Sequence, residues 1–276
     1  MPSFVITGTS RGLGFEFLRQ LSSDPKNTVI GLVRNKPATD KKVAEEIPNP
    51  AGKIHILHGD LDDYESLKKA AEDTAAITGG SLDYLIASAA RMPVYPEFFK
   101  GVGQLASDPA VIETEIKDMM RTNVTGNIHL IKLFLPLILK GQTKKIITIT
   151  SGMADLAVIN GAEVVHSPIY SMTKAAMNVI TAKLNAEYKK DGVLFIGICP
   201  GTLDGEGADI SNLSENEKSE VMTFMGNLNK MFPNFKGPRP PSEIVPKIKK
   251  VWEEASLEKG DGGAFLSHTG VPGQWL

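Results

Sequence analysis

A tyrosine and a lysine with a spacing suited to acid–base chemistry lie in the second half of the chain. Tyr170 and Lys174 are four residues apart. In a helix this spacing places both side chains on one face, one turn apart, so that a single substrate or cofactor can lie against both. Tyr64 and Lys68 have the same spacing. The setting distinguishes Tyr170, because it follows an apolar run at whose end Ser151 lies.

A glycine-rich turn near the N-terminus is suited to bind a dinucleotide. Gly8, Gly12 and Gly14 lie between an apolar run and a helical pattern, where small residues let the backbone approach a pyrophosphate held at the helix N-terminus. Their G-x-x-x-G-x-G spacing is wider than the common dinucleotide fingerprint. The position directly between strand and helix favours a binding turn over a purely structural one.

A cation lies where the adenosine ribose of such a cofactor is expected. Arg34 follows Gly14 by twenty residues, at the place where a cofactor without a 2′-phosphate would call for an acid. Arg11 in the turn adds a second guanidinium, whose fork geometry suits phosphate. The two arginines predict NADP(H), with solvated surface arginines as the alternative. Asp60 is placed to accept from the adenine amino group, although the segment Asp60-Leu61-Asp62-Asp63 could equally cap the helix that begins near Tyr64.

These groups together suit the reduction of a carbonyl. The cofactor supplies a hydride, and the protein supplies position, charge and a proton. Opposite charges about 4 Å apart, at an effective dielectric near 20, interact by about 4 kcal/mol. That energy is sufficient for Lys174 to make Tyr170 an effective general acid, while Ser151 is suited to hold the carbonyl oxygen.

Apolar runs and helical patterns alternate along the chain. The expected strands are Phe4–Thr7, Thr28–Val33, Ile54–His58, Tyr84–Ala87, Lys145–Thr150, Leu194–Cys199 and Gly263–Leu266. The expected helices are Gly12–Leu21, Lys41–Ile47, Tyr64–Ile77, Ile112–Leu139, Pro168–Lys189 and Ser242–Ala255. This alternation predicts an α/β fold: a single doubly wound Rossmann-type domain over residues 1–276, with a mostly parallel seven-stranded sheet and helices on both faces.

Two segments do not follow the alternation. Residues 91–109 are rich in Pro, Gly and Phe, and residues 202–241 open with glycines and close with a proline cluster. Both follow strand C-termini, where ligands bind in such sheets, so we expect substrate loops. The second is expected to be a mobile lid with a helix around 214–228. Ordinary surface insertions are the alternative.

Apolar residues near these loops favour an apolar, medium-sized carbonyl substrate. The expected pocket residues are Met153, Leu156, Val158, Ile159, Met222, Phe224 and Met225. Methionine adapts to irregular ligands, although at helical spacing it is also a common core residue. The histidines show no metal spacing, and no metal site is expected. His166, in the loop before Tyr170, is the one histidine expected to touch substrate, and Cys199 is expected to pack in the core.

Composition and charge argue against several classes of protein. A net charge of −2 and a pI near 6.2 give no basic field, so no nucleic-acid partner is expected. The single cysteine excludes an internal disulfide and fits a reducing, cytoplasmic setting. No targeting or membrane segment is predicted. The apolar helix ending at Leu139 indicates a subunit interface, in a homodimer or a homotetramer, but a fully internal helix of a monomer explains it nearly as well.

Taken together, the motifs resemble those of the short-chain dehydrogenase/reductase family along nearly the whole chain. They are Thr7–Gly14, Asp60, Asn123 in Thr122-Asn123-Val124, Ser151, Tyr170 with Lys174, and Pro200-Gly201. The ending, from Gly263 through Gly270 to Trp275, resembles the carbonyl-reductase branch that includes sniffer and C-factor proteins.

The resemblance implies roles for particular residues. It implies a catalytic tetrad of Asn123, Ser151, Tyr170 and Lys174, in which Lys174 also binds the nicotinamide ribose and Asn123 anchors a water that leads protons to it. The full set of expected cofactor contacts combines these residues with the glycine turn and the two arginines. It comprises Gly8, Ser10, Arg11, Gly12, Leu13, Gly14, Arg34, Asp60, Leu61, Ala87, Asn123, Tyr170, Lys174, Pro200, Gly201, Thr202 and Leu203.

The chain departs from the family pattern at two places. Ala87-Ser88-Ala89-Ala90 stands where the family has Asn-Asn-Ala-Gly, and Gly205 stands where it usually has threonine. The leading prediction is an NADPH-dependent oxidoreductase that reduces a ketone or aldehyde. The departures leave open a non-redox dehydratase, isomerase or cyclase that uses the cofactor as scaffold, and a cofactor-sensing binding protein. The intact Ser, Tyr and Lys set argues against both, because a scaffold needs no tuned phenol.

Overall fold

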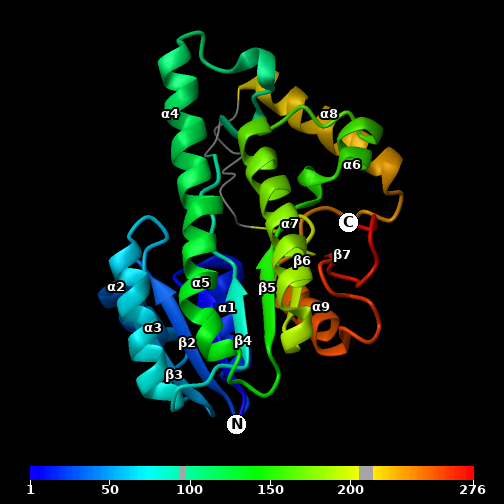
Figure 1. The fold of residues 1–276 in the computed structure, drawn as a ribbon. Helices are drawn as coiled ribbons and strands as arrows, with labels where there is room; N and C mark the ends of the chain where they lie inside the picture. The colour runs from blue at the N-terminus through cyan, green and yellow to red at the C-terminus, as the bar shows by residue number, and fades with distance from the viewer. Residues whose placement is uncertain (94–96, 205–213) are drawn as a thin grey trace.

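A parallel β-sheet forms the centre of the computed structural model, which describes residues 1–93, 97–204 and 214–276 (Figure 1). Its seven strands lie in the order β3-β2-β1-β4-β5-β6-β7, and every neighbouring pair is parallel. The strands are β1 (Ser3–Thr7), β2 (Thr28–Val33), β3 (Lys53–His58), β4 (Tyr84–Ala87), β5 (Lys145–Ile149), β6 (Leu194–Cys199) and β7 (Phe265–Ser267). The sheet therefore has the predicted α/β, Rossmann-like arrangement, all parallel rather than mostly parallel.

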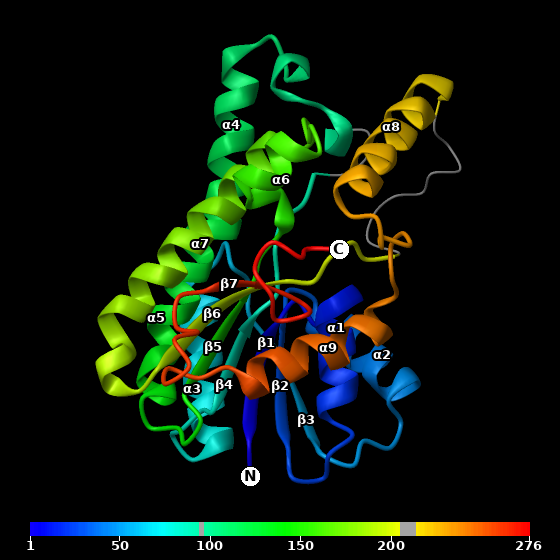
Figure 2. The same ribbon diagram turned by 90° about the vertical axis from the view of Figure 1, so that its right-hand side faces the viewer.

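Helices cover both faces of this sheet (Figure 2). One face is covered by α1 (Gly12–Leu21), α2 (Lys36–Glu46) and α9 (Pro241–Glu254), and the other by α3 (Tyr64–Thr78), α5 (Asn127–Ile138) and α7 (Pro168–Tyr188). Beyond the carboxyl ends of the strands lie α4 (Pro109–Met120), α6 (Leu156–Gly161) and α8 (Glu215–Met231). Short turns of 3-10 helix lie at Glu97–Phe99, Val102–Gln104, Gly152–Ala154 and Lys189–Asp191. Among the described residues, none of the helices combines the length and apolarity needed to cross a membrane.

Alternation along the strands divides the core into two layers. In β1, Phe4 and Ile6 pack with α1 and α9, whereas Val5 between them packs with the helices of the opposite face. A strand that is buried on both faces reads as a continuous apolar run. Full burial of such a side chain stabilises the fold by about 1.5–3 kcal/mol. The apolar residues of α5, including Leu130 and Phe134, are buried within this core, which accounts for their pattern as an internal helix.

The long helix expected at Ile112–Leu139 is interrupted. Helix α4 ends at Met120, a turn of π-helix follows at Arg121–Gly126, and α5 continues to Ile138. The extra residue of a π-turn shifts the side chains that follow, and such turns are frequent at functional sites. A hydrophobic pattern does not reveal it, because one inserted residue barely changes the period.

The helix expected at Lys41–Ile47 begins earlier, at Lys36. The Asn35 side chain accepts from the Ala38 N–H at 3.1 Å, and Pro37 lies in the first turn. Both are ordinary helix-start signals. The prediction missed this start because residues 36–40 are mostly polar and show no apolar stripe.

Candidate active site

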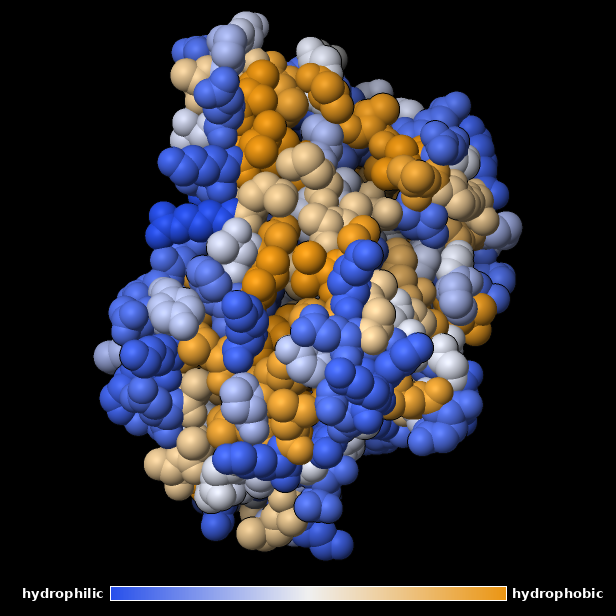
Figure 3. All heavy atoms as spheres, in the orientation of Figure 1, coloured by the Kyte–Doolittle hydropathy of each residue, from blue (hydrophilic) through white to orange (hydrophobic). Residues whose placement is uncertain are grey.

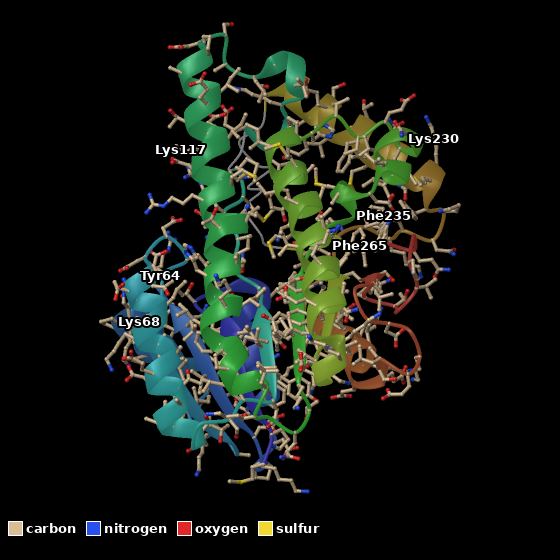
Figure 4. All side chains as sticks on the ribbon, in the orientation of Figure 1. Tyr64, Lys68, Lys117, Lys230, Phe235 and Phe265 are labelled. Atoms are coloured by element: carbon tan, nitrogen blue, oxygen red, sulfur yellow. The ribbon has the colours of Figure 1, made fainter. Side chains whose placement is uncertain are left out.

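Helix α7 places Tyr170 and Lys174 at the carboxyl edge of the sheet. Each residue is only 6% exposed. The Lys174 ammonium donates a hydrogen bond of 2.8 Å to the carbonyl of Ile149, the last residue of β5, and lies 5.5 Å from the centre of the Tyr170 ring. A buried ammonium requires such a partner, because desolvation is otherwise costly. The pair at Tyr64 and Lys68 points to solvent from α3 (Figure 4), and Tyr64 is 45% exposed.

The residue before α7, Ser167, has an unusual backbone conformation and anchors the start of the helix. Ser167 has a φ of +50°, in the left-handed region that a residue with a Cβ rarely adopts. Its N–H donates to Lys100 O at 3.1 Å, and its hydroxyl donates to Phe98 O at 2.6 Å. These two bonds tie the beginning of α7 to the segment after β4 and so help to orient Tyr170.

Ser151 lies two residues beyond the carbonyl that binds Lys174. Its side-chain oxygen accepts from the Met153 N–H at 3.2 Å and caps the 3-10 turn Gly152–Ala154. Met153 packs in the same apolar cluster as Tyr170. The end of β5 therefore brings Ser151, Tyr170 and Lys174 to one edge of the sheet, as the sequence predicts.

Asn123 lies in the π-turn and is buried. Its side-chain nitrogen donates to Arg91 O at 2.9 Å and to the Thr173 hydroxyl at 3.1 Å, and its side-chain oxygen accepts from the Arg91 N–H at 2.6 Å. The main-chain carbonyl of Asn123 accepts from the Asn127 side chain at 2.8 Å. The amide thus links the π-turn, α7 and the segment after β4, a positioning function that the sequence did not reveal.

The glycine turn has the close approaches expected of a pyrophosphate cradle. Gly8 has a φ of +77°, which favours glycine. A Cβ on Gly14 would lie 2.3 Å from the Gly8 carbonyl oxygen, so α1 can pack against the turn only with glycine there. Helix α1 begins after Arg11, which makes no side-chain cap. Ser10, Gly12 and Leu13 complete this turn, whose helix N-terminus suits an anion.

Three cations surround the outer side of the turn. Arg11 and Arg34 are exposed, and within the described ranges no ion pair engages either guanidinium. Lys42 reaches from α2, with its ammonium 3.4 Å from Ser10 O and 4.3 Å from the centre of the Phe15 ring. The sequence did not single out Lys42, because no local pattern relates it to the glycine turn, which lies 32 residues earlier in the chain.

The acidic segment before α3 caps that helix, as one interpretation of the sequence predicts. Asp63 caps the helix, since its side chain accepts from the N–H groups of Glu65 and Ser66 at 3.1 and 3.2 Å. Asp60 accepts from the Asp62 N–H at 3.0 Å instead. Asp60 is thus not the helix cap and stays a candidate for the adenine, beside the buried Leu61.

The backbone of the altered segment after β4 is braced by side chains from other parts of the chain. The Thr7 hydroxyl oxygen accepts from the N–H groups of Ser88 and Ala89, both at 3.0 Å. Because β1 and β4 are neighbours on either side of the point where the strand order reverses, Thr7 and Ala87 flank the crevice in which such sheets bind nucleotides. Thr7 and Asn123 therefore brace the backbone of this segment from two sides.

Pro200-Gly201 and the residues after it form the opposite wall. Gly201 has a φ of +80°. The carbonyl of Thr202 accepts from the Arg239 N–H at 3.0 Å, and Leu203 forms an isolated β-bridge with Arg239. Gly205 lies outside the described residues.

Next to Gly201 lies His268, a buried histidine whose pKa is lowered. Burial, assisted by the positive charges of Lys247 and Arg239, lowers the pKa of His268 to about 4, and its Nδ1 has no hydrogen-bond partner among the described residues. The unfolded chain, with an ordinary histidine pKa near 6.5, binds the proton more readily between these values. Stability is therefore lost as pH falls from about 6.5 toward 4.

We predict that this histidine makes the free energy of unfolding fall by about 2 kcal/mol between pH 7 and pH 5. Urea unfolding at both values measures the difference for the unmodified protein and for His268→Gln. The variant is expected to lose that part of the pH dependence. An equal dependence in both proteins would contradict the assignment.

An apolar groove of about 730 Å³ lies beside the start of α7. Its walls include Val102, Met153, Leu156, Ile159 and Met172, and Figure 3 shows apolar side chains gathered on this face. Of the expected pocket residues, Val158 is instead buried in an apolar cluster. Met222 is 75% exposed, so the expectation that it faces a substrate is wrong in this conformation.

His166 lies between this groove and α8. Its ring makes edge contacts with Phe99 and Phe224, at 5.3 and 4.7 Å between centres. Burial lowers the pKa of His166, and the charge of Glu220 opposes that shift. Nδ1 has no partner within the described part of the chain. Phe224 and Met225 pack with Leu228 in the cluster below, so α8 turns part of its apolar side inward.

Cys199, at the end of β6, is buried, and burial raises the pKa of its thiol to about 11. It packs rather than acts as a nucleophile, since the thiolate is the reactive form.

The parallel order and its crevice define a nucleotide-binding fold of the Rossmann type. The profile of the short chain dehydrogenase family matches residues 3–216. The short chain dehydrogenase virK of Hypocrea virens is 47% identical over 276 residues, which cover 100% of both chains. The chain belongs to the short-chain dehydrogenase/reductase family and is an oxidoreductase of that family.

Solved structures agree on the fold. The carbonyl reductase sniffer of D. melanogaster superposes with a TM-score of 0.75 at 20% identity, over 99% of this chain and 98% of that one. The NADPH-bound carbonyl reductase from chicken fatty liver gives a TM-score of 0.73 at 22% identity, over 98% of each chain. At these identities the likeness establishes the fold alone.

Proposed function

We propose that this protein is an NADPH-dependent carbonyl reductase for apolar, medium-sized ketones or aldehydes. The observation that carries the proposal is the buried Lys174 ammonium, held at 2.8 Å by the Ile149 carbonyl beside the Tyr170 ring, at the strand end that also bears Ser151. In this proposal, residues 1–276 act as one Rossmann-type domain, and segments 91–109 and 202–241 serve as its substrate loops.

The residues present fit NADP(H). The Gly8–Gly14 turn would hold the pyrophosphate, and Arg11, Arg34 and Lys42 would surround the 2′-phosphate. Asp60 would receive the adenine, and the walls at Ala87 and at Pro200–Leu203 would enclose the nicotinamide half. The NADPH present in the chicken reductase supports the same choice here. When bound, the cofactor supplies the hydride that reduces the carbonyl carbon.

The protein's own groups deliver the proton. The Ser151 oxygen accepts from the Met153 N–H, so its O–H remains to donate to the substrate oxygen. Tyr170 donates its phenolic proton to that oxygen as general acid. Lys174 stabilises the phenolate left behind: opposite charges separated by 5.5 Å, the distance from its ammonium to the ring centre, interact by about 3 kcal/mol at a dielectric near 20.

Asn123 supports this arrangement through its side chain. By holding Thr173, the neighbour of Lys174, and the backbone of Arg91, it fixes α7 against the crevice. Its main-chain carbonyl accepts one bond from Asn127 and keeps a second lone pair, which suits the proposed water that returns protons to Lys174.

The proposal is tested with a panel of ketones and aldehydes, following NADPH at the nicotinamide absorbance and the alcohol by chromatography. Oxidation of NADPH with an equal amount of alcohol is expected. Tight binding of NADPH without reduction of any carbonyl would favour the non-redox alternative. The hydrogen bonds of Thr7 and Asn123 to the backbone of residues 88–91 support the reductase proposal, because they pair this backbone beside the crevice without asparagine side chains of the segment.

Phe224 is predicted to contribute to the affinity for bulky substrates. Phe224→Ala removes the ring that packs against His166 and is expected to raise KM for a bulky ketone about three- to tenfold, because a lost aromatic contact is worth about 0.5–1.5 kcal/mol. NADPH affinity should stay within twofold. Met222→Ala, on the solvent side of the same helix, is the control and should leave KM unchanged. Equal kinetics in the two variants would place the substrate pocket elsewhere.

A further inference from the structure

The second-to-last residue of the chain reaches the loop that carries Ser151. Trp275 is 3% exposed. Its indole N–H donates to one carboxylate oxygen of Asp155 at 2.7 Å. The other oxygen of Asp155 accepts from the Ala157 N–H at 2.8 Å and caps α6. Hydrogen bonds to a charged acceptor belong to the stronger class, so Asp155 is held from two sides.

Packing encloses the same indole. The Trp275 ring stacks on the Phe265 ring, with centres 4.0 Å apart and planes at 20°. A Cβ on Gly152 would lie 3.0 Å from the Trp275 side chain, and one on Gly201 would lie 3.2 Å from its carbonyl oxygen. Figure 2 shows the C-terminal tail beyond the carboxyl ends of β6 and β7. The tail therefore lies against both the Ser151 turn and the Pro200-Gly201 wall.

Asp155 and Ser151 lie at the two ends of one hydrogen-bonded turn, since Ser151 is the N-cap and Asp155 the C-cap of the 3-10 helix Gly152–Ala154. The Asp155 N–H donates to Gly152 O at 3.0 Å, and the Ala154 N–H donates to Ser151 O at 3.0 Å. Within this turn the Met153 N–H binds the Ser151 side-chain oxygen. Because the two residues bound the same turn, a displacement of Asp155 is expected to shift the turn and with it the Met153 N–H that donates to the Ser151 oxygen.

We propose that Trp275 is a positioning residue for Ser151, acting through its bond to Asp155. This inference rests on the proposed function, in which Ser151 holds the substrate oxygen. Small misplacements of such a group lower catalytic rates strongly without removing any catalytic atom. The C-terminal tail thereby becomes part of the active-site support.

The test compares the same chemical change at the two tryptophans of the chain. Trp275→Phe keeps a stacking ring but removes the N–H and is expected to lower kcat about tenfold, with KM for the ketone and Kd for NADPH within twofold. Trp252→Phe alters the other indole, buried in the core against Phe17, and should leave kcat within twofold even though the melting temperature falls. Adding Trp275→Phe to Asp155→Ala should cause no further loss.

A second measurement does not need turnover. Amide hydrogen exchange at residues 152–157 is expected to become at least fivefold faster in Trp275→Phe and to stay unchanged in Trp252→Phe. If the unmodified protein reduces no carbonyl, the proposed function fails. Hydrogen exchange then still tests whether Trp275 holds Asp155 and the Ser151 turn in place. Unchanged exchange in Trp275→Phe, or an equal loss of kcat in both tryptophan variants, would overturn the inference.

Discussion

Replacing Tyr170 by phenylalanine is expected to lower kcat for carbonyl reduction about 10³-fold and to leave Kd for NADPH within twofold. The reason is that the change removes only the phenolic O–H, and a positioned general acid typically contributes 10²–10⁴-fold. The ring and its apolar neighbours Ile169 and Met119 remain. Steady-state kinetics with NADPH and a reduced ketone, together with a fluorescence titration of the cofactor, measure both quantities.

Tyr64→Phe is the matched control. Tyr64 precedes Lys68 by the same four residues, but it is exposed on α3 and its ring contacts His129 edge-on at 5.1 Å. This variant should keep kcat within twofold. Substantial reductase activity in Tyr170→Phe would instead show that the phenol is not the general acid and that another group delivers the proton.

The parts of the site that depend on period and order could be predicted from the sequence. Tyr170 and Lys174 share a helix face because of their spacing, and Ser151 joins them because it follows a strand of a parallel sheet, whose carboxyl ends meet at one edge. The glycine turn and Arg34 were predictable for the same reason, since their distances along the chain from the first and second strands determine where they lie.

The supporting contacts could not be predicted, because they join residues that no local pattern relates. Thr7 binds the backbone after β4 across 81 residues, and Trp275 binds Asp155 across 120. The π-turn at Asn123 changes the helical period for one turn only. Met222 illustrates a related failure: hydrophobicity predicted an inward side chain, whereas the helix turns Phe224 and Met225 inward and leaves Met222 in solvent.

These supporting contacts also explain how the chain tolerates its departures from the family pattern. After the fourth strand this chain offers only Ala and Ser where the family pattern has two asparagines. The Thr7 hydroxyl and the Asn123 amide bind its N–H and C=O groups from outside. Backbone groups near a buried crevice must be paired, and it matters less which residue supplies the partner. The backbone of the segment is therefore paired even though its own side chains supply no amide group.

The cofactor preference is expected to depend on the cations beside the glycine turn. We predict that the protein binds NADPH at least tenfold more tightly than NADH, a difference of about 1.4 kcal/mol, because Arg34, Arg11 and Lys42 can all approach a 2′-phosphate. Arg34→Asp should reverse this preference, since a carboxylate repels the phosphate and accepts hydrogen bonds from the free ribose hydroxyls of NADH. The ratio of the two dissociation constants would then change about a hundredfold.

Titration of both cofactors against the unmodified protein and Arg34→Asp measures this ratio. Lys230→Asp, which makes the same change in net charge on α8, far from the turn (Figure 4), should not alter it. Salt provides a further check: the advantage of NADPH should shrink as ionic strength rises, because exposed charges are screened over about 10 Å at 0.1 M, whereas NADH binding should change little. Equal affinity of the unmodified protein for both cofactors would show that the arginines are ordinary solvated surface groups, and the proposed reductase would then have to use either nicotinamide.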